Sequence, residues 1–137
     1  MSDESATNDG WSGWIPVLPT ADAARSVRFY CGVLGFAKDW EHRFADGWPL
    51  YVCVSRGPIR LHLNEHGDPA NQVSLCLGVP DVDAVYAEFA GRGLQTESPP
   101  EDREYGVRDF GFTDPDGHRL VIATRLPDFD DAPGRTA

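Results

Sequence analysis

The sequence lacks the segments that would place the chain in or across a membrane. It contains no apolar run near the roughly 20 residues that a helix needs to cross a bilayer. It begins with MSDESATNDG, an acidic and polar segment without the basic and apolar regions of a signal peptide. We therefore expect a cytoplasmic protein with no membrane partner.

Cysteine is scarce, and its placement argues against two common frameworks. The chain has three cysteines, Cys31, Cys53 and Cys76, and no C-x-x-C pair. An odd and widely spaced set does not suit a disulfide scaffold or a cysteine-rich zinc site. Each cysteine stands among apolar residues, so we expect buried free thiols in a reducing compartment.

Basic residues are also few, 12 against 22 acidic residues, which gives a formal net charge of -10. This charge repels nucleic acids and anionic membranes and attracts cationic ligands, although solubility alone is a simpler reason for it. The sequence has no G-x-S-x-G elbow, no Walker-type phosphate loop and no Rossmann glycine pattern. It therefore gives no support for the enzymes and nucleotide-binding proteins that use those motifs.

What the sequence does contain is an internal repeat with a shift of 59 residues. Each copy has the pattern of a strand, a helix and three further strands, so we predict an α+β fold of two βαβββ repeats. Two aspartates precede the helical segments, and their expected role is to cap the helix N-termini. The matching pairs are Leu18 and Leu77, Asp22 and Asp81, Leu61 and Leu120, and Leu63 and Ile122.

The pattern along the chain sets the expected boundaries. We expect one domain over residues 11–125, with repeat one at about 13–65 and repeat two at about 72–125. The first helix is expected over 21–36, ended by Gly35, and a strand with uniform alternation over 36–44. Residues 1–10 and 126–137 are rich in Asp, Pro, Gly and Ser without a period, so we expect both to be mobile.

Three segments resemble a known superfamily. PVLPTADAARSVRFYCGVLGF resembles the opening strand and helix of the glyoxalase, bleomycin-resistance and extradiol-dioxygenase (vicinal oxygen chelate) proteins, and DVDAVYAEFAGRGL resembles their second helix. YGVRDFGFTDPDGHRL resembles their closing hairpin, most closely that of the bleomycin-resistance branch. The resemblance implies that the strands form a curled mixed sheet cup with the helices on its outer face. It also implies a homodimer.

The same resemblance locates four positions that hold a metal in the metalloenzymes of the superfamily. Here they are Ile15, His62, Ser74 and Val121. Only His62 has a side chain that a catalytic divalent ion commonly uses, so we expect no metal and no cofactor. HLNEH, residues 62–66, matches the H-x-x-E-H zinc pattern, which requires a helix, but its flanking residues alternate as a strand. We expect His62 to face the cup and His118 to face solvent.

Aromatic residues are expected around the rim of the cup. Stacking on a planar ligand ring contributes about 0.5–1.5 kcal/mol per pair beyond burial, and a cation over an aromatic face is also favoured. The position of Tyr105 corresponds to a tryptophan that stacks on the drug in the bleomycin-resistance branch. Other phenylalanines, Phe29, Phe36, Phe89 and Phe112, are expected in the core. The candidate ligand-binding residues are Trp40, Phe44, Trp48, Tyr51, His62, Tyr105 and Phe110.

These features predict a metal-free binding protein. By resemblance it would sequester a small aromatic and cationic antibiotic, as bleomycin-resistance proteins do, and would have no catalytic residue. The alternative is a glyoxalase-like or dioxygenase-like lyase or isomerase that acts on a small metabolite, with His62 as a base. A weaker third hypothesis is a remnant of the fold that acts by protein association.

Overall fold

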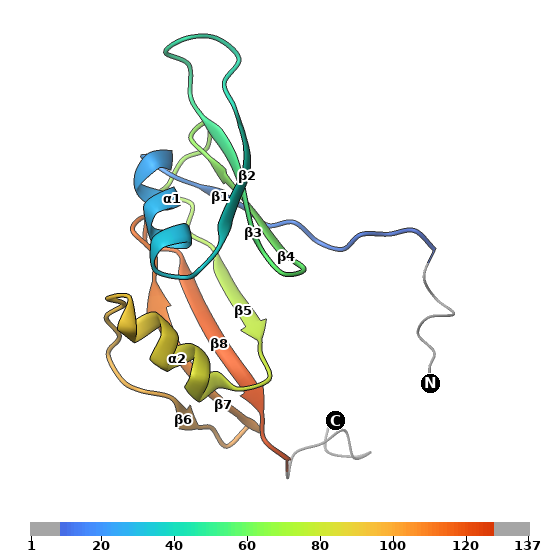
Figure 1. The fold of residues 1–137 in the computed structure, drawn as a ribbon, viewed down its shortest axis with the longest axis vertical. Coiled ribbons are helices and arrows are strands. Elements are labelled where there is room, and N and C mark those ends of the chain that lie inside the picture. Colours follow the sequence, from blue (N-terminus) through green and yellow to red (C-terminus); the bar gives the residue numbers. More distant parts are fainter. Residues whose placement is uncertain (1–8, 128–137) are drawn as a thin grey trace.

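The computed structural model of the chain describes residues 9–127. Repeat one contains β1 (Val17–Pro19), α1 (Ala23–Gly32), β2 (Ala37–His42), β3 (Tyr51–Arg56) and β4 (Ile59–Asn64). Repeat two contains β5 (Ser74–Gly78), α2 (Val82–Gly91), β6 (Glu101–Asp102), β7 (Val107–Thr113) and β8 (Arg119–Arg125). The predicted α+β fold of two βαβββ repeats is confirmed (Figure 1).

The strands form two four-stranded sheets, with the orders β1-β4-β3-β2 and β5-β8-β7-β6. In each sheet the first strand of the repeat runs parallel to the last, and the other neighbours are antiparallel. Val17 lies opposite His62, and Cys76 lies opposite Val121. Residues related by the shift of 59 therefore also occupy equivalent positions in the two strand ladders.

Both helices lie on the same side of the molecule and cover one face of each sheet (Figure 1). Each begins at the aspartate that the repeat indicates. Asp22 accepts a hydrogen bond from the backbone N–H of Arg25, and Asp81 accepts one from Ala84, both at 3.2 Å. Such a cap contributes about 1 kcal/mol to helix stability, and the N-cap prediction is confirmed for both repeats.

The first helix ends earlier than predicted. It stops at Gly32, where the N–H of Val33 donates to the carbonyl of Phe29. Gly35 follows the helix in a left-handed conformation, with φ of 77°. The left-handed backbone favours glycine here, and a Cβ at Gly35 would also lie 2.8 Å from guanidinium nitrogens of Arg56 and Arg92, so those side chains would have to shift.

The hydrophobic core lies between the helices and the sheets. The four phenylalanines expected there, Phe29, Phe36, Phe89 and Phe112, are confirmed as core residues or as packed against the core. Two of the three cysteines are at least partly shielded from solvent, but Cys76 is exposed, so the prediction of buried thiols is wrong for that residue. Cys76 is exposed because the helices do not cover its face of the second sheet.

The turn between β7 and β8 packs against α1 and joins the two repeats. The Tyr30 hydroxyl donates to the Asp114 carboxylate at 2.7 Å, in a fully buried position. Asp116 accepts from the Ser26 hydroxyl at 3.0 Å and from the Arg25 guanidinium at 2.7 Å. The contact between the repeats is therefore partly polar, and it depends on carboxylates of a single turn.

His118, at the end of this turn, is fully buried. Its Nδ1 accepts from the N–H of Val73 at 3.0 Å, so its Nε2 carries the proton and donates to the carbonyl of Pro19 at 2.7 Å. The prediction that His118 faces solvent is wrong, because the first repeat packs over the turn. His118 is thus a structural link between β1, the segment before β5, and β8.

A second polar link joins β3 to α2. Arg56 forms two hydrogen bonds with the Glu88 carboxylate, at 2.7 and 2.9 Å, and a third with the carbonyl of Leu34 at 2.8 Å. Arg92 contacts the same carboxylate at 2.6 Å. These groups close around Gly35 at the end of repeat one.

Within residues 9–127, no helix is long and apolar enough to cross a membrane. The expectation of mobile ends over 1–10 and 126–137 falls almost wholly outside the described residues.

Candidate ligand-binding site

Candidate site residues lie on the face of the first sheet that the helices do not cover, which we call the cup face. Pairing across the ladders places Trp40, Cys53 and His62 side by side on this face. The next row contains His42, Tyr51 and Asn64. Neighbouring side chains in a strand point to opposite faces, so the intervening residues of β3 and β4 enter the core.

Trp40 reaches the cup face because β2 contains a β-bulge. The ladder pairs Lys38 with Val54 and Trp40 with Cys53, which leaves Asp39 as an extra residue. The predicted uniform alternation over 36–44 would put Lys38 and Trp40 on one face, and that prediction is wrong. The bulge reverses the phase, so Lys38 lies on the helix face and Trp40 on the cup face.

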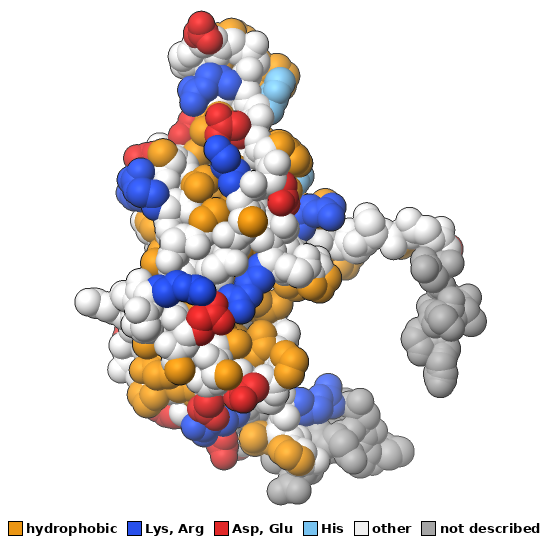
Figure 2. All heavy atoms as spheres, viewed as in Figure 1, with side chains coloured by type: hydrophobic (Ala, Val, Ile, Leu, Met, Phe, Trp, Pro, Cys, Tyr) orange, Lys and Arg blue, Asp and Glu red, His pale blue; other side chains and the backbone are white. Residues whose placement is uncertain are grey.

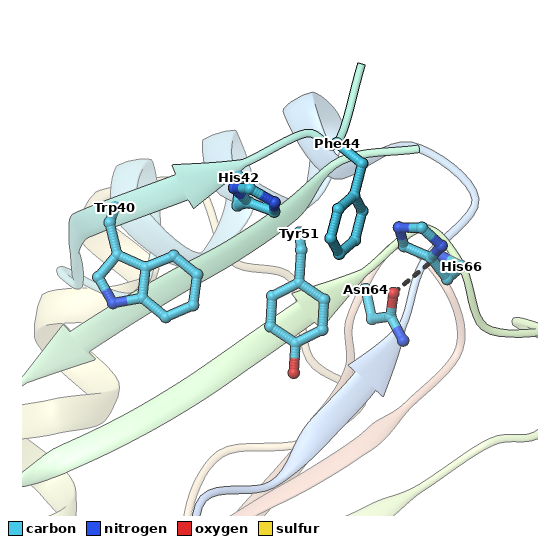
Figure 3. A pocket seen from close by; sticks show the side chains of 6 residues that line it. All are labelled: Trp40, His42, Phe44, Tyr51, Asn64 and His66. Carbon is cyan, nitrogen blue, oxygen red and sulfur yellow. Dashed lines mark hydrogen bonds between the residues drawn. The ribbon is translucent and has the colours of Figure 1, made fainter. Parts of the chain in front are cut away.

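Rings converge above β2, β3 and β4 to form an aromatic hollow of about 440 Å³ (Figure 3). The Trp40 and Tyr51 rings are nearly parallel, at 7° and 6.0 Å between centroids. Phe44 meets His42 edge to face at 4.5 Å. The hollow is lined by Trp40, His42, Phe44, Tyr51, Asn64 and His66.

The rings of the hollow present exposed surface to solvent. Trp40 is 45% exposed and Phe44 is 68% exposed. The Asn64 side chain is oriented by the N–H of His66, which donates to its oxygen at 2.8 Å. A flat ligand placed here would cover apolar ring faces and meet an amide at the edge.

His62 lies beside the aromatic hollow and is held by two aromatic neighbours. Its Nδ1 is 2.8 Å from the Tyr51 hydroxyl, and its ring centroid is 5.3 Å from that of Trp40. Burial and the nearby charge of Arg60 lower the pKa of His62, so its imidazole is neutral at neutral pH. Burial raises the pKa of Tyr51, which keeps its hydroxyl protonated.

A second hollow of about 620 Å³, the polar hollow, adjoins the first and shares Trp40 with it. The Cys53 thiol donates to Asp39 at 3.7 Å. Burial and the Asp39 carboxylate raise the pKa of Cys53, so it is a thiol rather than a reactive thiolate. The polar hollow is lined by Ile15, Asp39, Trp40, Cys53, Ser55, Arg60 and His62.

The corresponding face of the second sheet, which is the second cup face, carries a smaller hollow of about 400 Å³, the repeat-two hollow. Arg103 donates to the Asp109 carboxylate at 2.7 Å. The Tyr105 hydroxyl donates to the other oxygen of Asp109 at 3.4 Å, while the Tyr105 side chain is largely exposed. The lining residues are Arg103, Tyr105, Asp109, Gly111, Arg119 and Val121.

The structure brings together some of the predicted site residues and separates others. Trp40, Phe44 and Tyr51 line the aromatic hollow, and His62 lies next to it. The Trp48 ring lies 6.3 Å from Phe44 at the outer edge. Tyr105 lines the repeat-two hollow.

The expectation that Phe110 lines the cup is wrong in its geometry. Phe110 is fully buried, and its ring packs against Tyr86 and Phe89 of α2. It pairs with Ile122, whose side chain is also in the core, so both point to the helix face.

Three lining residues were not among the predicted site residues, namely His42, Asn64 and His66. The signal for two of them is the strand pairing, which sets His42 and Asn64 beside Tyr51. His66 enters the hollow from the turn after β4, and the local sequence gives no sign of it.

The residues at the superfamily's metal positions do not fit a metal. Ile15 and His62 line the polar hollow, Ser74 lies opposite Arg119, and Val121 lines the repeat-two hollow. Three of these four side chains offer no imidazole, carboxylate or thiolate. Among residues 9–127, no group of three or more His, Cys, Asp or Glu side chains is arranged to hold a metal ion. We therefore derive no metal-dependent step.

Comparison with known proteins gives consistent matches. A family model described as glyoxalase superfamily protein matches residues 4–128. A bleomycin resistance protein from Geobacillus stearothermophilus is 28% identical, and the match covers 82% of this chain and 96% of that protein.

Two solved structures of related proteins share the fold. A bleomycin-binding protein complexed with bleomycin is 28% identical, with a TM-score of 0.65, and the match covers 82% of this chain and 98% of that one. A bleomycin resistance determinant encoded on the transposon Tn5 is 27% identical, with a TM-score of 0.65, over 82% of this chain and 97% of that one. Since the family model spans most of the sequence, the chain belongs to the glyoxalase superfamily, and bleomycin resistance proteins are among its relatives.

Proposed function

We propose that the protein is a metal-free, bleomycin-resistance-like binding protein that sequesters a small aromatic and cationic antibiotic or a related metabolite. The observation that carries this proposal is the aromatic hollow, in which exposed faces of Trp40 and Phe44 stand beside Tyr51. Sequestration needs affinity alone, so the missing metal ligands are no obstacle.

The relatives and the charge of the chain support this proposal. The curated relatives are named bleomycin resistance proteins, and one related structure is a complex with bleomycin. The net charge of -10 would draw a cationic ligand toward the protein over long range, an effect that salt screens. Ring stacking at short range would survive salt, so the two contributions are separable.

The proposal includes a homodimer in the cytoplasm. The two cup faces lie on separate sheets, and neither sheet closes around its own hollow. A second copy could complete each cup. Trp14, in the segment before β1, is 97% exposed, and this segment stands clear of the body (Figure 2). The three cysteines are free, as in a reducing compartment.

The second candidate function is a lyase or isomerase of the glyoxalase or dioxygenase type acting on a small metabolite. The contact between Tyr51 and Nδ1 of His62 favours it, because a neutral imidazole fixed at one nitrogen could exchange a proton through the other. This candidate needs turnover of a substrate, and the binding proposal does not.

The test of the binding proposal is calorimetry and thermal unfolding with bleomycin, alongside elemental analysis of the purified protein. We expect saturable binding, quenching of tryptophan fluorescence and a raised melting temperature. Ligand at about 100 times its Kd stabilises a fold by about 2.7 kcal/mol. No thermal shift at low salt would contradict the proposal. About one metal ion per chain, lost in His62→Ala, would favour the enzyme instead.

A further inference from the structure

Arg60 occupies an unusual position on the cup face. It lies opposite Ser55 in the β3–β4 ladder and lines the polar hollow. Within residues 9–127 its guanidinium forms no hydrogen bond or ion pair, whereas Arg56 and Arg103 each bind a carboxylate. In a chain with a net charge of -10, acidic partners are plentiful. An arginine that faces a hollow without an acidic partner is available to bind an anion.

The groups around Arg60 suit an anion of modest size. Ser55 offers a hydroxyl donor, and the neutral His62 offers no competing negative charge. Asp39 is the one acid that lines the hollow, and it is engaged by the Cys53 thiol and forms no ion pair with Arg60. The positive charge of Arg60 already reaches this space, since it contributes to the lowered pKa of His62.

Repeat two has an arginine at the equivalent position. Arg119 follows Arg60 by the repeat shift of 59 residues and lines the repeat-two hollow. Its guanidinium also forms no ion pair within the described part of the chain. The acid in that hollow, Asp109, is neutralised by Arg103. Each of the two sheets therefore presents, beside its hollow, one arginine that forms no ion pair within residues 9–127.

We propose that the polar hollow is a carboxylate subsite, and that the ligand is a planar aromatic molecule with an anionic group beside its ring. The ring stacks on Trp40 in the aromatic hollow, and the carboxylate binds the two-pronged guanidinium of Arg60 with help from Ser55. A ligand that is also cationic holds its positive group away from Arg60. This inference rests on the proposed function, because both place a planar ligand in the same cup.

The test compares three probes with one ring system and different charge: naphthoate, naphthamide and naphthylmethylammonium. Calorimetry on the full chain measures their dissociation constants, with Arg60→Gln as the variant. Arg28→Gln is the matched control, because Arg28 lies exposed on α1 and its loss changes the net charge equally. Both substitutions are on exposed residues, and thermal unfolding checks that the fold is kept.

We expect naphthoate to bind wild type at least about fivefold more tightly than naphthamide, with the preference lost in Arg60→Gln and kept in Arg28→Gln. Equal or tighter binding of naphthylmethylammonium would overturn the inference, as would a preference that survives Arg60→Gln. If bleomycin binds while the carboxylate preference is absent, the subsite fails and the proposed function stands. If neither bleomycin nor any of the three probes binds, both fail.

Discussion

Trp40 is the side chain at which the two hollows of the first sheet meet. Its ring is nearly parallel to that of Tyr51 and meets that of His62 edge to face, and these two neighbours also contact each other, yet nearly half of the Trp40 surface is exposed. A ring held by two neighbours and open on its outer face is suited to stacking, because the ligand does not have to order it first.

Trp40→Ala is therefore expected to weaken bleomycin binding by roughly 1 kcal/mol, or about fivefold, while the unfolding free energy changes little. Calorimetry gives the first quantity and equilibrium denaturation the second. Arg28→Ala is the control, since Arg28 is exposed on α1 and lines neither hollow of the first sheet. Equal bleomycin affinities in wild type and Trp40→Ala would show that stacking on Trp40 does not contribute to binding.

Tyr105 tests whether the repeat-two hollow takes part in binding. Its ring is 70% exposed and carries little core packing, so Tyr105→Ala should leave the unliganded fold near its original stability. We expect bleomycin affinity to fall by roughly 1 kcal/mol. Tyr105→Phe keeps the ring and loses only the long hydrogen bond to Asp109, so it should bind as wild type does. Unchanged binding in Tyr105→Ala would restrict the site to repeat one.

The residue types were enough to predict which aromatic residues are candidates, but the face of the sheet that each one occupies depends on how the strands pair. The sequence prediction placed Phe110 on the cup, although its ladder partner Ile122 is the repeat match of Leu63, and both Ile122 and Leu63 lie in the core. Counting back from Ile122 through the tight turn would have put Phe110 on the helix face. The burial of His118 could not be deduced in this way, because it depends on contacts with Pro19 and Val73, which are distant in the sequence.

At the scale of elements, the repeats are joined by the turn between β7 and β8 and by the end of α2. Burial and the neighbouring Asp114 raise the pKa of Tyr30 well above its usual value, so its hydroxyl stays protonated and donates. Removal of a buried donor leaves its acceptor unpaired, which costs more than the hydrogen bond alone.

Tyr30→Phe is expected to lower the unfolding free energy by roughly 1–3 kcal/mol, because the Asp114 carboxylate loses its buried partner. Equilibrium urea unfolding measures the change. Tyr86→Phe is the matched control, since Tyr86 packs against the core without a hydroxyl hydrogen bond in the described residues. A loss in Tyr30→Phe no larger than in the control would show that the hydrogen bond from Tyr30 to Asp114 contributes little to the stability of the fold.

Glu88 makes the second polar link, between β3 and α2, dependent on pH. The hydrogen bonds from Arg56 and Arg92 lower the pKa of Glu88 from 4.5 to about 2. A carboxyl group whose pKa is lower in the folded than in the unfolded state stabilises the fold at pH values above its unfolded-state pKa. This contribution is lost as the pH falls from 4.5 toward about 2.

Glu88→Gln should thus be less stable than wild type at neutral pH, by at most roughly 1 kcal/mol because the network is partly exposed and screened by salt. The difference should shrink as the pH is lowered through this window. Urea unfolding at several pH values checks it, with Glu97→Gln, an exposed acid without an ion pair in the described residues, as the control. A difference that is constant with pH would contradict the ionic origin.

For the whole molecule, the repeat made the fold predictable because neither copy alone can bury both faces of its sheet. The shift of 59 residues predicted the helix caps and the matched strand ladders. The bulge at Asp39 could not be predicted, since the alternation of FAKDWEHRF is unbroken in the sequence. The division into two sheets with open hollows depends on long-range packing, which no local pattern records.

The open cup faces lead to a prediction about assembly. Hydrophobic side chains lie along the margin between the two halves, beneath the segment that leaves the body (Figure 2). We expect sedimentation at micromolar concentration to give about twice the mass of one chain, because a partner would cover this surface. A monomer mass across that range would contradict the homodimer and would leave each hollow to act by itself.

The bulge in β2 also has a consequence for how the strand tolerates insertions and deletions. Without Asp39, the remaining residues of Ala37–His42 would match Tyr51–Ser55 one for one, and Trp40 and His42 would keep their present partners. A one-residue deletion inside Tyr51–Arg56 would instead exchange the two faces of β3 and turn Tyr51 or Cys53 toward the helices. Among proteins that descend from this chain, insertions and deletions should therefore be found at the bulge in β2 and be absent from β3.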